Sequence, residues 1–265
     1  MQNFLDFSGK VALVTGSTKG IGMATAKLFA EHGADVIINS RHRDDVDRVA
    51  KELRSAGHKA FGIRADVGEW EEVKEMMETI DRHFGRLDVI VNNAALRHVP
   101  SLLKQAEDIR ALDDSAWNEM LRVNILGMVH TCKAGVELMK RGGGGSIINI
   151  SSGAAVNPPP YAALSYKTSK GAILSFTRSL AAELAKDGIR VNAVMPILIK
   201  TETESRGQQF DPALFRALVD ASLFGRVGTP DEVASVCLFL ASTMASFISG
   251  EAIALGGGLK FYTDI

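Results

Sequence analysis

Short runs of β-branched and other apolar residues alternate with longer stretches of helical periodicity along most of the chain. The apolar runs predict strands at 11–15, 35–40, 59–65, 87–93, 146–151, 189–195 and 251–255. The stretches between them predict helices at 20–32, 44–56, 69–84, 114–140, 164–187 and 230–242. Strands and helices that alternate in this way are typical of repeated βαβ units, which build a parallel sheet.

These strands lack the polar and apolar alternation of a sheet with one wet face, which indicates that helices cover both faces. The predicted fold class is α/β, with a doubly wound parallel sheet of about seven strands in one Rossmann-type domain over residues 1–265. Residues 197–222 have no strong strand character and hold Phe210 and Phe215 at helical spacing. We expect that segment to form a lid over a substrate pocket.

Composition and charge narrow the classes of function. The chain has 30 basic and 31 acidic residues, and this balance offers no basic stripe for nucleic acid. No apolar run approaches the roughly 20 residues of a membrane span, and no signal-peptide pattern stands at the beginning, so a cytoplasmic protein is expected. The two cysteines are predicted to be buried reduced thiols. The histidines form no metal-binding pair, so no metal is predicted. The expected partner is a small molecule.

A glycine-rich turn, Thr15-Gly16-Ser17-Thr18-Lys19-Gly20-Ile21-Gly22, directly follows the first predicted strand and opens a helix. Such a turn brings backbone N–H groups and the positive end of the helix dipole onto a pyrophosphate. The alternative is an ordinary tight turn between a strand and a helix. Its position in the first βαβ unit favours the dinucleotide site.

The end of the second strand bears on the choice between NAD and NADP. It reads Asn39-Ser40-Arg41-His42-Arg43, without the carboxylate that would bind a ribose 2′-hydroxyl. Ser40, Arg41 and Lys19 could instead hold a 2′-phosphate, which predicts NADP(H). The alternative is that both cations are solvated surface charges.

Tyr166 and Lys170 are four residues apart at the start of a predicted helix and therefore share one face. A neighbouring cation favours the phenolate and makes Tyr166 a candidate general acid and base, although this spacing is also common by chance. Ser152 stands where the strand at 146–151 ends, with Ser151 as an adjacent competitor; both could simply cap the turn. Asn124 is unusual within a predicted helix, because Asn is a poor helix former. One explanation is a side chain that binds water or backbone; the alternative is a side chain that faces solvent.

Together, TGSTKGIG, Asp66-Val67, Asn92-Asn93-Ala94-Ala95, Asn124, Ser152 and YKTSK, in this order, resemble the short-chain dehydrogenase/reductase family over nearly the whole chain. The resemblance implies that Tyr166 donates the proton, Ser152 orients the carbonyl, Lys170 lowers the pKa of the tyrosine and binds ribose, and Asn124 holds a relay water. It also implies a homotetramer, or a dimer, assembled through helices 114–140 and 164–187. With the turn and the second strand included, the expected cofactor-binding set is Gly16, Thr18, Lys19, Gly20, Ile21, Gly22, Ser40, Arg41, Asp66, Val67, Asn93, Ala94, Ala95, Tyr166, Lys170, Pro196, Ile199 and Thr201.

Two residues depart from the family pattern, because Ala95 and Ile197 stand where the family usually has glycine. Ile197 either crowds the nicotinamide or forms part of the substrate wall. Arg97 or His98 could contact a polar substrate; the alternative is that both are surface residues. A partly apolar substrate pocket is expected from Leu96, Pro158, Pro159, Tyr161, Ile197, Phe210 and Phe215.

The predicted function is hydride transfer between NADP(H) and a ketone or aldehyde, or the corresponding secondary alcohol, with Tyr166 as proton donor. A non-catalytic NADP(H)-sensing regulator is the alternative from another class. The retained Asn124, Ser152, Tyr166 and Lys170 argue against it. Reduction of an enoyl double bond is disfavoured because the family's enoyl reductases space tyrosine and lysine more widely than four residues.

Overall fold

The computed structural model contains one seven-stranded parallel sheet. The structure describes residues 4–97, 109–111, 113–158, 162–201, 216, 219–220 and 222–258. The strands are β1 (Val11–Val14), β2 (Asp35–Ser40), β3 (Ala60–Arg64), β4 (Val89–Asn92), β5 (Gly145–Ile150), β6 (Ile189–Pro196) and β7 (Ala252–Leu255). They lie in the order β3-β2-β1-β4-β5-β6-β7, and every neighbouring pair is parallel. The predicted fold class is confirmed.

The order of the strands reverses between β1 and β4. From β1 the chain proceeds outward through β2 to β3, and it then returns to the other side of β1 to place β4. The connections after β1 and β4 therefore leave in opposite directions, which opens a crevice at the carboxyl edge of the sheet. The predicted catalytic and cofactor-binding residues, all within the described part of the chain, lie at or near this edge.

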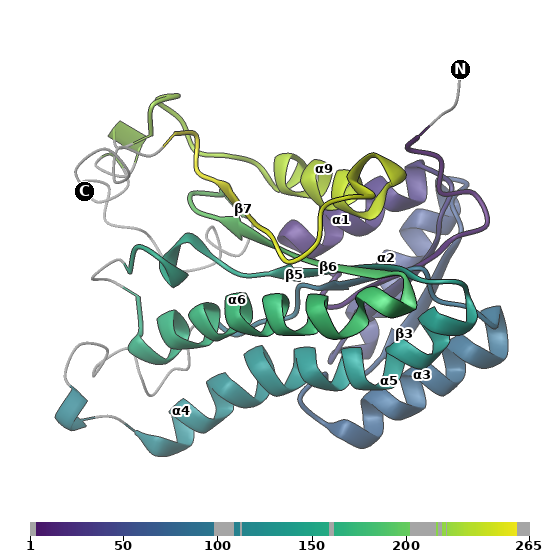
Figure 1. The fold of residues 1–265 in the computed structure, drawn as a ribbon, viewed down its shortest axis with the longest axis horizontal. Helices are drawn as coiled ribbons and strands as arrows, with labels where there is room; N and C mark the ends of the chain where they lie inside the picture. The colour runs from purple at the N-terminus through teal and green to yellow at the C-terminus, as the bar shows by residue number, and fades with distance from the viewer. Residues whose placement is uncertain are drawn as a thin grey trace.

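Helices cover both faces of the sheet (Figure 1). The helices are α1 (Gly20–Glu31), α2 (Arg43–Ser55), α3 (Trp70–Phe84), α4 (Asp114–Leu121), α5 (Gly127–Arg141), α6 (Leu164–Leu184) and α9 (Pro230–Ala241). The short 3-10 helices are η2 (Ile109–Ala111), η4 (Gly153–Ala155), η5 (Ala185–Asp187) and η6 (Thr243–Ala245). Helices α1, α2 and α9 pack on one face, and α3, α5 and α6 pack on the other.

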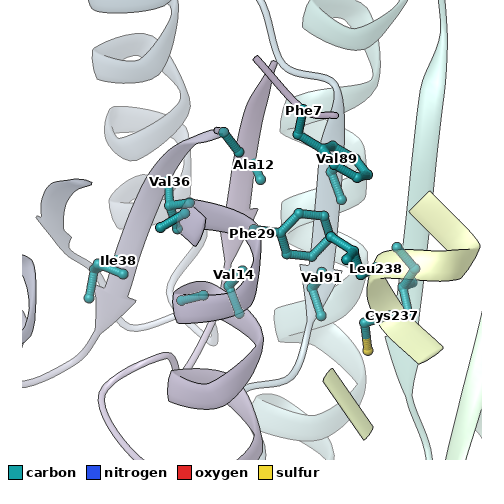
Figure 2. Packing of buried hydrophobic residues seen from close by; sticks show 14 of the residues in the cluster. Phe7, Ala12, Val14, Phe29, Val36, Ile38, Val89, Val91, Cys237 and Leu238 are labelled. Atoms are coloured by element: carbon teal, nitrogen blue, oxygen red, sulfur yellow. The ribbon is translucent and has the colours of Figure 1, made fainter. Parts of the chain in front are cut away.

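Alternate residues of each strand feed two separate apolar layers. In β1, Ala12 and Val14 belong to the first layer, between the sheet and α1, α2 and α9. Val11 and Leu13 belong to the second layer, between the sheet and α3, α5 and α6. Figure 2 shows Phe29 of α1 seated over β1 and β4 in the first layer. Its ring meets Phe7 edge to face at 5.1 Å between centroids. Burial on both faces explains why these strands are apolar throughout.

The two cysteines belong to these layers. Cys237 of α9 lies in the first layer, and Cys132 of α5 lies in the second. Both are buried free thiols, as the sequence predicts, and burial raises the pKa of each to about 12.

One predicted helix differs from the structure. The stretch 114–140 is continuous by periodicity, but a π-helical turn, η3 (Arg122–Leu126), separates α4 from α5. Such a turn admits an extra residue and often marks a functional position. Asn124 lies inside this turn, so the irregularity coincides with a predicted site residue.

The predicted lid at 197–222 lies largely outside the described residues, which include only 197–201, 216, 219–220 and 222 of it. Within the described part of the chain, no helix combines the length and apolar character needed to cross a membrane. The same residues contain no cluster of three or more His, Cys, Asp or Glu side chains arranged to hold a metal ion.

We predict that Phe29→Ala lowers the free energy of unfolding by about 3–5 kcal/mol, because a fully buried ring leaves a cavity between α1 and the sheet. Denaturant titration at a fixed protein concentration measures this loss. Lys27→Ala, on the exposed side of the same helix, is the matched control and should stay within about 0.5 kcal/mol. A loss below 1 kcal/mol for Phe29→Ala would contradict this account of the layer.

Candidate active site

The glycine turn after β1 is shaped by close backbone approach. Gly16 has a φ of +63°, and a Cβ there would lie 2.9 Å from Cα of Ala94. A Cβ on Gly22 would collide with the Asn93 amide and the Gly16 carbonyl. At the start of α1, Lys19 provides no side-chain cap. The first N–H groups of α1 are therefore not capped by the N-cap side chain, which suits a phosphate.

Thr15 fastens this turn to the segment after β4. Its hydroxyl accepts hydrogen bonds from the backbone N–H groups of Asn93 and Ala94, each at 3.0 Å, and donates to Val91 O at 3.3 Å. The Asn93 side chain returns the link by donating to the carbonyls of Thr15 and Gly16. The sequence analysis did not single out Thr15; a polar residue that ends a fully apolar strand was the available signal.

A cavity of about 740 Å³ runs along the carboxyl edge from β2 to β6. Nearly all of the predicted cofactor-binding residues line it: Gly16, Thr18, Lys19, Gly20, Ile21, Ser40, Arg41, Asp66, Val67, Asn93, Ala94, Ala95, Tyr166, Lys170, Pro196, Ile199 and Thr201. Gly22 does not line it and serves instead to let α1 approach Asn93. The shape and the uncapped helix fit a dinucleotide, with the glycine turn at its phosphates.

One end of the cavity gathers the residues predicted to recognise a 2′-phosphate. Lys19, Ser40 and Arg41 all line it. Arg41 is exposed, and its Nε lies 3.3 Å from the ring nitrogen of His42. The carboxylate of Asp45 also borders this end but is paired with Arg48 at 3.4 Å. Two cations and a hydroxyl are thus available to an anion at this end.

Asp66, a member of the expected cofactor-binding set, is held by Arg122, a partner that the sequence analysis missed. Arg122 of η3 donates to the Asp66 carboxylate at 3.2 Å and also binds Glu119 and Glu69. Although burial opposes its ionisation, the Gly68 N–H and Arg122 lower the pKa of Asp66. The contact joins residues 56 positions apart, so no local pattern reveals it.

Ser152 and Tyr166 meet at the other end of the cavity. The Ser152 hydroxyl lies near enough to the phenol to lower the pKa of Tyr166, and Ser152 also accepts from the N–H of Ala154 at 3.2 Å. Ser151, the competing candidate, is buried and donates to the carbonyl of Lys170 at 2.8 Å. The geometry therefore favours Ser152, because the hydroxyl of Ser151 fastens α6 to β5.

Lys170 is almost completely buried, and its ammonium donates to the carbonyl of Ile150 at 2.8 Å. Burial, and then the charge of Arg97, lower its pKa to about 7. Burial raises the pKa of Tyr166, while Ser152 and Arg97 act in the opposite direction. Burial is the largest influence on both groups, and the expectation that Lys170 lowers the pKa of Tyr166 stays a prediction.

Asn124 is buried and does not face solvent. Its carbonyl oxygen accepts from the N–H of Leu96 at 2.7 Å, and its amide donates to Leu96 O at 3.0 Å and to Ser169 Oγ at 3.0 Å. It does not line the large cavity. A second cavity of about 10 Å³ lies between Asn124 and Lys170 and has room for about one water molecule.

Other predicted pocket residues have mixed outcomes. Leu96 and Ile197 line the cavity, and the Ile197 side chain packs against Gly153, so it forms a wall of the pocket. Arg97 lines it as well, so it is a pocket residue as well as an exposed one. Pro158 is exposed and is not among the lining residues. His98, Pro159, Tyr161, Phe210 and Phe215 lie outside the described residues.

Comparison with known proteins gives consistent matches over nearly the whole chain. A family model described as enoyl-(acyl carrier protein) reductase matches residues 16–260. Dehydrogenase/reductase SDR family member 4 from Bos taurus is 38% identical over 250 residues, which cover 94% of this chain and 86% of that protein.

Two solved structures are similar in fold and carry nicotinamide cofactors. A gluconate 5-dehydrogenase from Burkholderia cenocepacia J2315, in complex with NADP and tartrate, superposes with a TM-score of 0.89 at 29% identity over 99% of each chain. A 7α-hydroxysteroid dehydrogenase, complexed with NADH and 7-oxo glycochenodeoxycholic acid, superposes with a TM-score of 0.89 at 28% identity over 98% of each chain.

We predict that Lys170→Met removes a pH-dependent component of stability. Between about pH 7 and the unfolded lysine pKa of about 10.4, the unfolded chain binds one proton more than the folded chain, so stability rises with pH. Denaturant titrations at pH 6, 7 and 8 measure this slope. The free energy of unfolding of the wild type, relative to the variant, should rise by up to about 1.4 kcal/mol from pH 7 to 8. Parallel pH profiles would contradict a buried, weakly basic Lys170.

Proposed function

Because the chain belongs to the short-chain dehydrogenase/reductase family, we propose that it transfers a hydride between NADP(H) and a ketone or aldehyde, or the corresponding secondary alcohol. The observation that carries the proposal is the meeting of Ser152, Tyr166 and Lys170 at one end of a cavity whose other end is a glycine turn. A phenol, a hydroxyl and a buried ammonium can together exchange a proton with a carbonyl oxygen.

Tyr166 donates the proton to the carbonyl oxygen, and Ser152 holds that oxygen by a hydrogen bond. A bound nicotinamide supplies the hydride in reduction or accepts it in oxidation. Lys170 replenishes the proton through the small cavity that it shares with Asn124. The pKa of about 7 for Lys170 suits this task, because the group then gains and loses a proton near neutral pH.

The glycine turn and the start of α1 would hold the pyrophosphate, and Asp66 with Val67 would border the adenine. Asn93, Ala94 and Ala95 would line the adenosine ribose. Pro196, Ile199 and Thr201 would border the nicotinamide, and all three line the cavity. Thr201 comes within 3.6 Å of where a Cβ on Gly20 would lie, so the segment after β6 reaches back to the glycine turn.

The preference for NADP(H) rests on Lys19, Ser40 and Arg41. The similar solved structures contain NADP in one case and NADH in the other, so family membership leaves the choice to these residues. A 2′-phosphate would gain charge-assisted hydrogen bonds from both cations. Since cells keep NADP largely reduced, the preference favours carbonyl reduction as the direction in vivo.

Two other activities receive less support. The similar proteins give no support to a non-catalytic sensor, and the placing of Ser152 beside Tyr166 in the cavity would have no use in one. The matching family model is described as an enoyl reductase, but the separation of four residues between Tyr166 and Lys170 favours carbonyl chemistry. A homotetramer through α4, α5 and α6, the lid at 197–222 and the cytoplasmic location stay predictions.

We predict that Tyr166→Phe abolishes NADPH-dependent reduction of a carbonyl panel while NADPH still binds. The phenol supplies the proton, and its removal is expected to lower kcat by at least about 100-fold. Absorbance of the reduced nicotinamide measures turnover, and fluorescence titration measures binding. Wild-type binding without turnover of any panel member would argue for the sensor instead.

We predict that Arg41→Asp reverses the cofactor preference, because a carboxylate at this position repels a 2′-phosphate and can accept from a ribose hydroxyl. The ratio of kcat/KM for NADPH to that for NADH should fall by at least about tenfold. Arg43→Asp, two residues further on, is a control that changes the same charge at the start of α2. An unchanged ratio in Arg41→Asp would overturn the NADP(H) preference.

A further inference from the structure

The catalytic end of the cavity carries positive charge. The basic side chains that line this end are Arg97 and Lys170, and none of the described residues lining it is acidic. The two carboxylates that border the cavity belong to Asp45 and Asp66, at the end formed by β2 and β3. Both are already engaged, Asp45 by Arg48 and Asp66 by Arg122. Among the described residues, no carboxylate at the catalytic end would repel an anionic group of a substrate.

The backbone that carries Arg97 is held in place. Both the N–H and the carbonyl of the preceding residue, Leu96, are hydrogen-bonded to the buried amide of Asn124, at 2.7 and 3.0 Å. Asn124 is in turn tied to Ser169 on α6, the helix that carries Tyr166. The chain therefore leaves β4 along a fixed path past the catalytic tyrosine.

The guanidinium of Arg97 acts on the reacting groups. Its charge lowers the pKa of the Tyr166 phenol and of the Lys170 ammonium, so its field reaches both of them. The side chain lines the cavity and keeps contact with solvent. A cation in this position can contact a substrate whose carbonyl lies at Tyr166.

We propose that Arg97 is a specificity-determining residue that binds a carboxylate of the substrate, so that the preferred substrates are oxo acids and the corresponding hydroxy acids. The guanidinium presents a planar fork of N–H donors that matches the two oxygens of a carboxylate. Leu96 and Ile197, which line the same end, pack against the carbon segment of the substrate. The inference rests on the proposed function for the chemistry at the carbonyl.

The carboxylate takes part in binding and is not consumed. In the reduction, the carbonyl carbon gains a hydride from NADPH and the carbonyl oxygen gains the proton of Tyr166. The products are the hydroxy acid and NADP⁺, and the C–O⁻ group at Arg97 is unchanged. In the oxidation of a hydroxy acid, both transfers run in reverse.

Kinetics on matched pairs of oxo acids and their methyl esters test the inference, because each pair differs mainly in the negative charge. The wild type should favour the acid by at least about tenfold in kcat/KM. Arg97→Gln should lower the acid-to-ester ratio by at least about tenfold, and Arg97→Lys should keep part of it. Using the ratio removes any effect of the variant on the pKa of Lys170 in the free enzyme, which both members of a pair share.

Arg82→Gln is the matched control, since it removes an exposed arginine on α3 that bonds Thr79 and does not line the cavity. Its acid-to-ester ratio should equal that of the wild type. A wild type without preference for acids, or an equal ratio in Arg97→Gln, would overturn the inference and leave the proposed function standing.

A binding measurement separates this inference from the proposed function. Calorimetric titration with malonate, an inert dicarboxylate, is made with NADP⁺ saturating so that the 2′-phosphate site is filled. Arg97→Gln should weaken malonate binding by at least about tenfold relative to the wild type and to Arg82→Gln. Absence of binding to the wild type overturns the inference. Arg97-dependent binding without turnover of any carbonyl would support it while the proposed reaction fails.

Discussion

The close approach of the turn after β1 to the segment after β4 determines the geometry of the rest of the site. Gly16 lies so near Ala94 that a single added carbon would approach its Cα to 2.9 Å, and the Thr15 hydroxyl accepts from both residues that follow Asn92. The two segments leave the sheet in opposite directions, and this contact fixes the narrow base of the crevice between them. The position at which α1 begins and the path of the chain at Leu96 both depend on this contact.

A second group of polar contacts carries this geometry to the catalytic end. Asn124 binds both backbone groups of Leu96 and the hydroxyl of Ser169, and that hydroxyl donates to the carbonyl of Tyr166 at 2.7 Å. These groups are buried, and leaving any of them unpaired would cost about 1–3 kcal/mol. This cost stabilises the network against the loss of any one contact. The network positions the backbone of Tyr166 and does not contact its phenol.

The sequence predicts those features that depend on local pattern. Strand and helix positions agree with the structure within a few residues, because burial on both faces leaves an uninterrupted apolar run in each strand. The glycine turn and the spacing of Tyr166 and Lys170 are also local. The π turn around Asn124, the choice of Ser152 over Ser151 and the hold of Arg122 on Asp66 depend on contacts between distant segments. Periodicity carries no information about such contacts, and the continuous pattern of 114–140 conceals the π turn.

The charges at the catalytic end are coupled. Burial already opposes the protonated form of Lys170, and Arg97 opposes it further, so the ammonium is held near its point of half-protonation. An anion bound at Arg97 would offset that second effect, and its binding would raise the pKa of Lys170. By thermodynamic linkage, protonation of Lys170 would strengthen the binding of that anion by the same free energy. A bound carboxylate substrate would therefore increase the protonated fraction of Lys170, the group that replenishes the proton consumed in the reduction.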